Sequence, residues 1–293
     1  MRRSLLFLAA TLVALPVFAR HGNRDVSFND SDFASTDCSA MSVRFDGGRV
    51  PVVSEDVAVG NVRSLRVRSD RNGGIRVIGS SGSGYAVKAC KAVGSGLEAS
   101  QIRVAFDGNE VSASGPDNED WIVYFIVQTP RNASLDLESR NGPVGVYQFN
   151  GTMTARAKNG PLSLKESSGT IDASTVNGPI SLSGGSGNVK LAATNGPLSV
   201  KLDGYAWEGG NLDGTTQNGP VSLKLPRGYR SGVVLEALGH GPVSCHAEDC
   251  YTARQRVAES DDDDQPRRIE LGSGAPAVHL STVNGPVSVK DQE

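Results

Sequence analysis

The sequence is poor in aromatic residues, and neither sign of charge dominates it. Its 293 residues include only 8 Phe, 6 Tyr and 2 Trp, and 29 basic against 32 acidic residues give a formal net charge of −3. Loss of Arg2 and Arg3 with an N-terminal leader would take the charge to −5. Because no general basic field exists, the composition argues against nucleic acid as a partner, and against binders of anionic polymers in general.

The chain is rich in glycine and has few long apolar segments. The chain has 35 Gly, an excess that disfavours helical bundles, while an apolar content of 38% is too high for wholesale disorder. Of the protein classes considered, the composition therefore favours an extended, turn-rich β protein.

The N-terminus carries the one long apolar run. Arg2 and Arg3 precede the 15 residues from Leu5 to Ala19, which end in Val17-Phe18-Ala19, with small residues where a signal peptidase reads. A membrane anchor would need about 18 or more apolar residues. We therefore predict a signal peptide at 1–19 and an exported mature chain with no transmembrane segment, located in the periplasm, on the outer surface or in the medium.

Four cysteines in an exported chain predict disulfides, and three connectivities are possible. We favour Cys38 with Cys90, and Cys245 with Cys250. The rival interpretation of the second pair is a metal site built from His240, Cys245, His246 and Cys250. Its spacing matches no zinc ribbon or finger, and strand alternation sends Cys245 and His246 to opposite faces, so we expect no metal ligands.

A repeated tripeptide organises the second half of the chain. The seven copies are Asn141-Gly142-Pro143, Asn159-Gly160-Pro161, Asn177-Gly178-Pro179, Asn195-Gly196-Pro197, Asn218-Gly219-Pro220, His240-Gly241-Pro242 and Asn284-Gly285-Pro286. Their spacings are 18, 18, 18, 23, 22 and 44, the last being two units of 22. Self-similarity at a fixed period is typical of a solenoid or array.

Apolar residues recur at fixed offsets from each copy. Three residues after the first position stand Val144, Leu162, Ile180, Leu198, Val221, Val243 and Val287, and six before it stand Leu135, Met153, Ile171, Val189, Leu212, Val234 and Val278. Ser or Gly, and often Lys, occupy the alternate positions after each corner. Since a strand sends alternate residues to opposite faces, each unit predicts two strands with apolar residues inside and small or basic residues outside.

Two topologies suit such strands: a parallel β-solenoid, and an antiparallel meander that pairs sequence neighbours. In a meander each strand would pair with a strand of the other kind, so serines at the same offset of successive units would not be neighbours. In a solenoid like residues stack about 4.8 Å apart, and the Asn amides can form a ladder of hydrogen bonds. The pattern therefore favours an all-β fold, a parallel β-solenoid (β-helix) of roughly 18- to 23-residue coils with Asn-Gly-Pro corners.

The flanking segments complete the predicted organisation. Residues 20–60 form a tether and a capping strand, and the solenoid occupies 61–293, beginning at a degenerate copy of the corner, Asn72-Gly73-Gly74. About three larger coils are expected between residues 72 and 141. The acidic run Asp261–Asp264 lies in an insertion at about 251–268, which we expect to be a disordered loop.

Four features of the sequence are the signal peptide, the segment Arg71-Asn72-Gly73-Gly74-Ile75-Arg76-Val77, the repeated Thr-Val-Asn-Gly at 175–178 and 282–285, and the ending from Gly274 to Val289. In these features the chain resembles the bacterial "putative adhesin" family, a domain of unknown function with a β-solenoid fold. The resemblance spans roughly residues 60–293. It implies a cell-envelope or surface setting, and the family supplies no catalytic residues.

A search for catalytic chemistry finds one pair of carboxylates. Asp136 and Asp172 are two coils apart, about 9.6 Å at 4.8 Å per coil, a separation compatible with an inverting glycosidase. Asp172 is, however, expected beside Lys190 as an ordinary surface pair. The corner motifs lack the Asp of calcium-binding repeats.

A cluster of aromatic residues is the sharper candidate. The longer coils after Asn195 and Asn218 carry Tyr205, Trp207 and Tyr229, and Tyr251 follows at a similar offset. Stacking of consecutive coils would gather them at one edge as a surface for sugar rings or a protein. The alternative is that they plug the core where the coil widens.

The sequence thus favours an exported, non-enzymatic module, structural or adhesin-like, with no cofactor, catalytic residue or metal, and with a glycan or an envelope protein as partner. The alternatives are a carbohydrate-active β-helix enzyme and a periplasmic interaction partner in envelope signalling. The sequence leaves the oligomeric state open.

Overall fold

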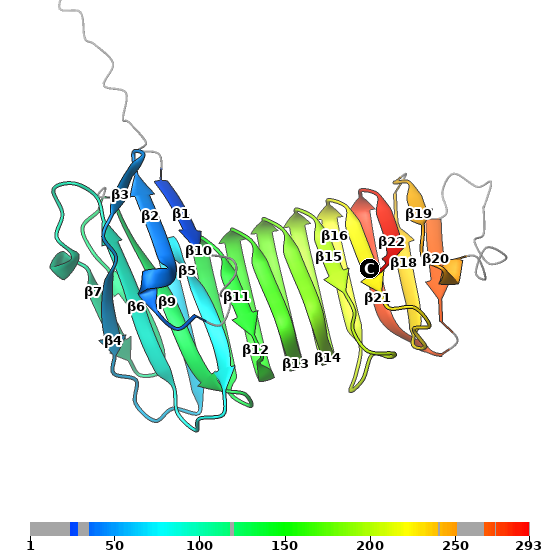
Figure 1. Ribbon diagram of the computed structural model, residues 1–293, viewed down its shortest axis with the longest axis horizontal. Coiled ribbons are helices and arrows are strands. Elements are labelled where there is room, and N and C mark those ends of the chain that lie inside the picture. Colours follow the sequence, from blue (N-terminus) through cyan, green and yellow to red (C-terminus); the bar gives the residue numbers. More distant parts are fainter. Residues whose placement is uncertain are drawn as a thin grey trace, which may run out of the picture.

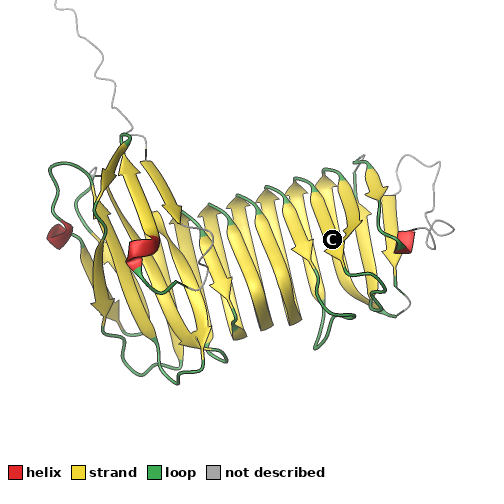
Figure 2. Ribbon diagram, viewed as in Figure 1, coloured by secondary structure: helices red, strands yellow, loops and turns green. Residues whose placement is uncertain are grey.

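The computed structural model describes residues 24–28, 35–117, 120–239, 241–250, 267–272 and 274–292. The described chain is all-β, and most of its strands lie side by side in one long row (Figures 1 and 2). The predicted signal peptide at 1–19, His240, and residues 251–266 of the predicted insertion, Tyr251 included, lie outside the described residues.

Parallel strands of the repeat region stack in register. The strands involved are β5 (Ser64–Ser80), β10 (Ser134–Asn141), β11 (Val144–Tyr147), β12 (Asn150–Asn159), β13 (Leu162–Asn177), β14 (Ile180–Asn195), β15 (Leu198–Lys201), β16 (Leu212–Asn218) and β17 (Val221–Leu225). Val144 lies opposite Leu162, Leu162 opposite Ile180, and Ile180 opposite Leu198. From β10 to β15 each strand pairs in parallel with the corresponding strand one unit later, so the meander is excluded for this part of the chain.

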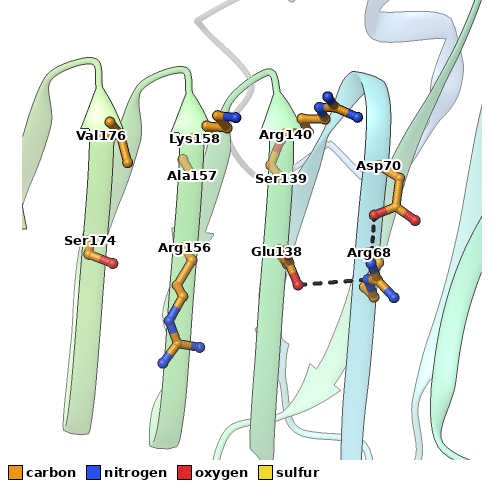
Figure 3. Close-up of a pocket in the computed structure, with 10 residues that line it drawn as sticks. All are labelled: Arg68, Asp70, Glu138, Ser139, Arg140, Arg156, Ala157, Lys158, Ser174 and Val176. Carbon is orange, nitrogen blue, oxygen red and sulfur yellow. Dashed lines mark hydrogen bonds and ion pairs between the residues drawn. The ribbon is translucent and has the colours of Figure 1, made fainter.

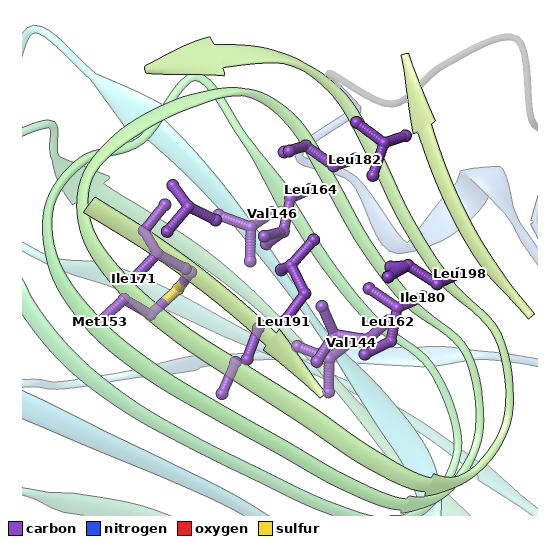
Figure 4. Close-up of a cluster of buried hydrophobic side chains, with 14 of the residues drawn as sticks. Val144, Val146, Met153, Leu162, Leu164, Ile171, Ile180, Leu182, Leu191 and Leu198 are labelled. Atoms are coloured by element: carbon purple, nitrogen blue, oxygen red, sulfur yellow. The ribbon is translucent and has the colours of Figure 1, made fainter. Parts of the chain in front are cut away.

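The predicted apolar columns form the core of this coil stack. Both sets point inward from facing strands, as Figure 4 shows for Val144, Leu162 and Ile180 on one side and Met153 and Ile171 on the other. Each of these five side chains is at most 1% exposed. Burying a side chain of this size stabilises the fold by about 1.5–3 kcal/mol, and every coil contributes several.

The corners are held by a ladder of asparagine amides. Asn159, Asn177 and Asn195 each donate an Nδ2–H to the Oδ1 of the asparagine one coil earlier, at 2.8, 2.8 and 3.0 Å. Asn218 and Asn284 extend the ladder at 2.9 Å each. The ladder predicted from the repeat is therefore confirmed.

Glycine is required at these corners. Gly178 has a φ of 157°, and a Cβ there would stand 2.2 Å from the carbonyl oxygen of Gly160 in the preceding coil. The contact arises because the corners of adjacent coils stack backbone on backbone, which leaves no space for a side chain.

A second set of hydrogen bonds supports the corners from inside. Thr175, Thr216 and Thr282 are at most 2% exposed, and each hydroxyl donates to the carbonyl of a corner glycine in the adjacent coil, at 2.8–3.0 Å. These bonds satisfy the buried hydroxyls, whose burial would otherwise be costly. The three residues share one offset, two before the corner asparagine.

The coils do not stack in chain order at the C-terminal end. After β17 the chain forms β18 (Gly232–Ala237) and β19 (Val243–Cys245), passes through β20 (Arg267–Leu271), antiparallel to β18, and returns as β21 (Pro276–Asn284) and β22 (Val287–Asp291). β22 pairs with β17 on one side and with β19 on the other. The last coil of the sequence therefore fills the place between the two before it, as Figure 1 shows in red between yellow and orange.

Residues 81–130 differ from the three parallel coils expected there. β6 (Ala86–Val93) is antiparallel to both β4 (Val53–Val57) and β9 (Trp121–Pro130), and β7 (Arg103–Asp107) forms a hairpin with β8 (Glu110–Ser114) after the short helix η2 (Ala99–Gln101). Of the described strands within residues 81–130, β8 and β9 are the two that pair with β5 in parallel.

In this part of the chain β9 is buried on both faces. Val123 and Phe125 face the main core, whereas Ile122, Tyr124 and Ile126 face a second one. That second core is covered by a small antiparallel sheet of β1 (Arg24–Phe28), β2 (Met41–Phe45) and β3 (Gly48–Val50), with the short helix η1 (Cys38–Ala40) directly before β2.

Both predicted disulfides are present. Cys38–Cys90 ties the N-terminal sheet to β6, and Cys245–Cys250 closes a short loop after β19. Since Cys245 and Cys250 are bonded to each other, they are not available as the metal ligands of the rival interpretation.

The asparagine ladder predicts a measurable contribution to stability. Replacing Asn177 by Ala removes two amide hydrogen bonds, and we expect a loss of about 1–2 kcal/mol because a net hydrogen bond contributes roughly 0.5–1.5 kcal/mol. Urea unfolding measures it, with Asn150→Ala, at an exposed position outside the ladder, as the control. Equal stability of the two variants would contradict a structural role for the ladder.

The inverted coil order predicts which engineered cysteines can form a disulfide. Ser222 lies directly opposite Ser288, whereas Ser244 lies beyond Ser288 on the next strand. Mild oxidation should therefore join Ser222→Cys to Ser288→Cys. It should leave Ser222→Cys and Ser244→Cys as free thiols, because a disulfide needs Cα atoms within about 7 Å. Counting free thiols by mass spectrometry measures both outcomes. A disulfide between Ser222→Cys and Ser244→Cys, with free thiols in the other pair, would instead show that the last coils stack in the order of the sequence.

Candidate functional site

The two widened coils do bring aromatic residues together. Arg230 donates its backbone N–H to the carbonyl of Tyr205 at 2.7 Å, and its guanidinium lies 5.8 Å from the Tyr205 ring. Trp207 donates its backbone N–H to Ser231 at 2.9 Å. The segments around Tyr205 and Tyr229 are thus neighbours, as their insertion at consecutive coils predicted.

These aromatics do not form the predicted surface. Trp207 and Tyr229 are only 7% and 4% exposed, while Tyr205 is 67% exposed. The Trp207 indole N–H donates to the carbonyl of Gly187 at 2.9 Å, and burial raises the pKa of Tyr229 to about 12. The prediction was wrong for Trp207 and Tyr229: they plug the core where the coil widens, since removing their apolar area from water outweighs exposing them. Tyr251 lies outside the described residues.

Each of the two carboxylates has a basic residue on the neighbouring strand, and Asp136 forms an ion pair with its neighbour. Asp136 contacts Arg66 at 3.1 Å, and Asp172 lies in register opposite Lys190, as predicted. The Asp136 carboxylate is therefore already engaged by a basic side chain of the neighbouring strand.

A shallow hollow of about 530 Å³ lies on the same side of the stack (Figure 3). Arg68 pairs with Asp70 and Glu138 there, at 3.0 and 3.7 Å, and the Asp70 carboxylate raises the pKa of Arg68. Across the coils Arg140 and Lys158 reach the rim. The hollow mixes both signs of charge, and no motif in the sequence marks it.

This side of the stack alternates in charge. Asp172, Lys190 and Asp213 follow one another in register on β13, β14 and β16, and Arg66 lies opposite Asp136. We call the outward side of the strands that precede the corners the charge-paired face. Opposite charges directly across a ladder attract, so these neighbouring pairs favour the observed register.

The outward side of the strands that follow the corners has another composition, and we call it the serine–lysine face. Its serine row consists of Ser163, Ser181, Ser199, Ser222, Ser288 and Ser244, each in register with the next. The hydroxyl of Ser181 donates to Ser163, and that of Ser222 to Ser199, both at 3.0 Å. The row therefore follows the length of the stack.

Two positions further along each strand a second row carries lysines. Lys201, Lys224 and Lys290 lie directly opposite one another on β15, β17 and β22 and are exposed. We call these three residues the lysine row. Ser183 precedes the row in register. Lys165 comes before it, with its ammonium 5.4 Å from the Tyr147 ring.

The face offers hydroxyl and ammonium groups, which bind by hydrogen bonds and charge. Across the described ranges, no group of three or more His, Cys, Asp or Glu side chains could hold a metal ion. The sequence revealed the residues of both rows, but it did not reveal that Lys224 neighbours Lys290, because coil order decides that.

Comparisons with known proteins find fold-level likeness only. No protein-family model matches the chain, and no curated protein matches it. Among solved structures, a "putative cell adhesion protein" from Clostridium sporogenes is 11% identical over 83% of this chain and 100% of its own, with a TM-score of 0.29. A "putative adhesin" from Bacteroides fragilis is 12% identical over 83% and 97%, with a TM-score of 0.25. Both names agree with the resemblance seen in the sequence, but scores this low carry no argument about function.

No helix in the described part of the chain is both long and apolar enough to span a membrane.

The buried aromatics predict opposite outcomes for two neighbouring substitutions. Trp207→Ala empties a core position and removes the bond to Gly187, so we expect a loss of about 3–5 kcal/mol. Tyr205→Ala, on the exposed side of the same segment, should change stability by less than about 0.5 kcal/mol. Thermal or urea unfolding measures both, and similar losses for the two variants would contradict the assignment of Trp207 to the core.

Proposed function

We propose that the protein is an exported, non-enzymatic β-solenoid that acts as a structural or adhesin-like binding module of the cell envelope. The coil stack forms a rigid rod, and the serine–lysine face is its contact surface. The observation that carries this function is the continuity of the serine row across the coils.

The shape of the face supports attachment to something extended. Small-molecule sites are generally concave, whereas the serine row lies on the outer side of a sheet whose neighbouring strands are in register. A row of hydroxyls held by the backbone needs little ordering when a partner binds, which reduces the entropic cost of association.

The disulfides support export. Cys38–Cys90 and Cys245–Cys250 use all four cysteines, as expected for a protein that folds in an oxidising compartment. The signal peptide predicted at 1–19 gives the route.

Binding of the mature chain, residues 20–293, to isolated cell-envelope fractions and to a glycan array tests the function. We expect retention on an envelope polysaccharide or protein, and loss of that retention in Ser199→Tyr/Ser222→Tyr, because two bulky rings would lift a partner off the face.

The matched control places the same rings on the charge-paired face, as Ser174→Tyr/Ala192→Tyr on β13 and β14, where Ser174 lies opposite Ala192. That variant should bind like the parent. Absence of binding to any envelope fraction, or equal loss in both variants, would overturn the proposal.

A further inference from the structure

Among the described residues, the lysine row has no ion-pair partner. Lys201, Lys224 and Lys290 occupy three adjacent parallel strands, so their side chains leave the sheet about 4.8 Å apart. Like charges directly opposite one another are destabilising. The fold does not impose this arrangement, because on the charge-paired face of the same coils Lys190, Asp213 and His279 lie in register, with a carboxylate between the two basic residues.

Neighbouring carboxylates are engaged elsewhere. Asp203 accepts the backbone N–H of Gly185, Asp291 accepts that of Glu248, and Glu248 pairs with Arg227 at 3.4 Å. Within the described residues, no carboxylate forms an ion pair with any of the three lysines. The row is thus a line of three exposed cations that no described carboxylate pairs with.

We propose that the lysine row and the serine row beside it bind a linear polysaccharide that carries carboxylates, lying along the rod and across the strands. This inference rests on the proposed function, whose ligand class it specifies. The row follows one line through successive coils, so its charges match a chain with repeated anions better than a single compact anion.

The serines supply the second half of the recognition. Ser199, Ser222 and Ser288 run parallel to the lysines, two residues away on the same strands and the same face. Their hydroxyls can donate to and accept from sugar hydroxyls while the ammonium groups meet the carboxylates. A polyuronate offers both kinds of group.

The net negative charge of the chain does not oppose such a ligand. Composition argued against anionic polymers because no general basic field exists, but salt limits the reach of surface charge to about 8–10 Å. Within that distance the lysine row presents one sign only. The binding is expected to be local, of modest affinity and sensitive to salt.

The test measures binding of the full mature chain to oligogalacturonate by calorimetry at low and at physiological salt, with the fully methyl-esterified oligomer as the uncharged probe. We expect binding of the acid form, weakening with added salt, and no binding of the ester. Lys201→Gln/Lys224→Gln/Lys290→Gln should weaken it about tenfold, since each exposed ion pair contributes a severalfold factor at most. The matching Lys→Arg triple variant should keep the affinity.

The control removes the same charge from the charge-paired face, as Arg140→Gln/Lys158→Gln/Lys190→Gln. That variant should bind like the parent. Equal losses in both triple variants, equal binding of acid and ester, or preference for a single-stranded DNA of similar length would overturn the inference. If envelope retention persists in the Lys→Gln variant, the ligand class is wrong and the proposed function stands. Polyuronate binding without envelope retention would support the ligand class and contradict the proposed function.

Discussion

Parallel, in-register pairing of each coil with its spatial neighbour is the constraint on which the repeat region depends. It places Leu162 over Val144 and Ile180 over Leu162, so that the core is a set of uniform columns. The same register brings each corner asparagine within hydrogen-bond distance of the one before it. It also allows only glycine where corner backbones meet, as at Gly178. A shift of one residue would turn every apolar column outward.

The register also determines what the outside of the rod can do. A residue type that recurs at one outward position of successive coils forms a continuous row along the stack. A preference for serine or lysine at a single position of the repeat therefore sets the chemistry of a whole face. The strands before the corners carry both signs of charge, and Asp172 lies directly opposite Lys190. On the strands after the corners the rows are serine and, over three coils, lysine. The two faces of one rod thus differ in what they can bind, although their backbones are built alike.

Several features could be predicted because they depend only on local offsets. The inward columns and the asparagine ladder follow from residue types at fixed spacing, and the structure confirms them. It also confirms both favoured disulfides, which together were one of three possible connectivities. The aromatic edge failed for a different reason. Length and offset correctly brought Tyr205 and Trp207 into one widened corner, but offset alone does not tell a plug from a surface. Burial in the folded structure distinguishes the two: the Trp207 indole N–H donates to the carbonyl of Gly187 inside the core, whereas the Tyr205 side chain is exposed to solvent.

The amino-acid pattern by itself determined the repeat, its corners and its inward and outward sides, because strand alternation and stacking are short-range rules. Only the tertiary structure decided the order of the last coils and the topology of residues 81–130. β22 lies between β17 and β19 because the chain turns back at β20, antiparallel to β18, before forming its final coil. β9, buried on both faces, lies between parallel β5 and antiparallel β6. Such pairings join segments tens of residues apart, and identical repeat units offer many equivalent neighbours, so local sequence cannot choose among them.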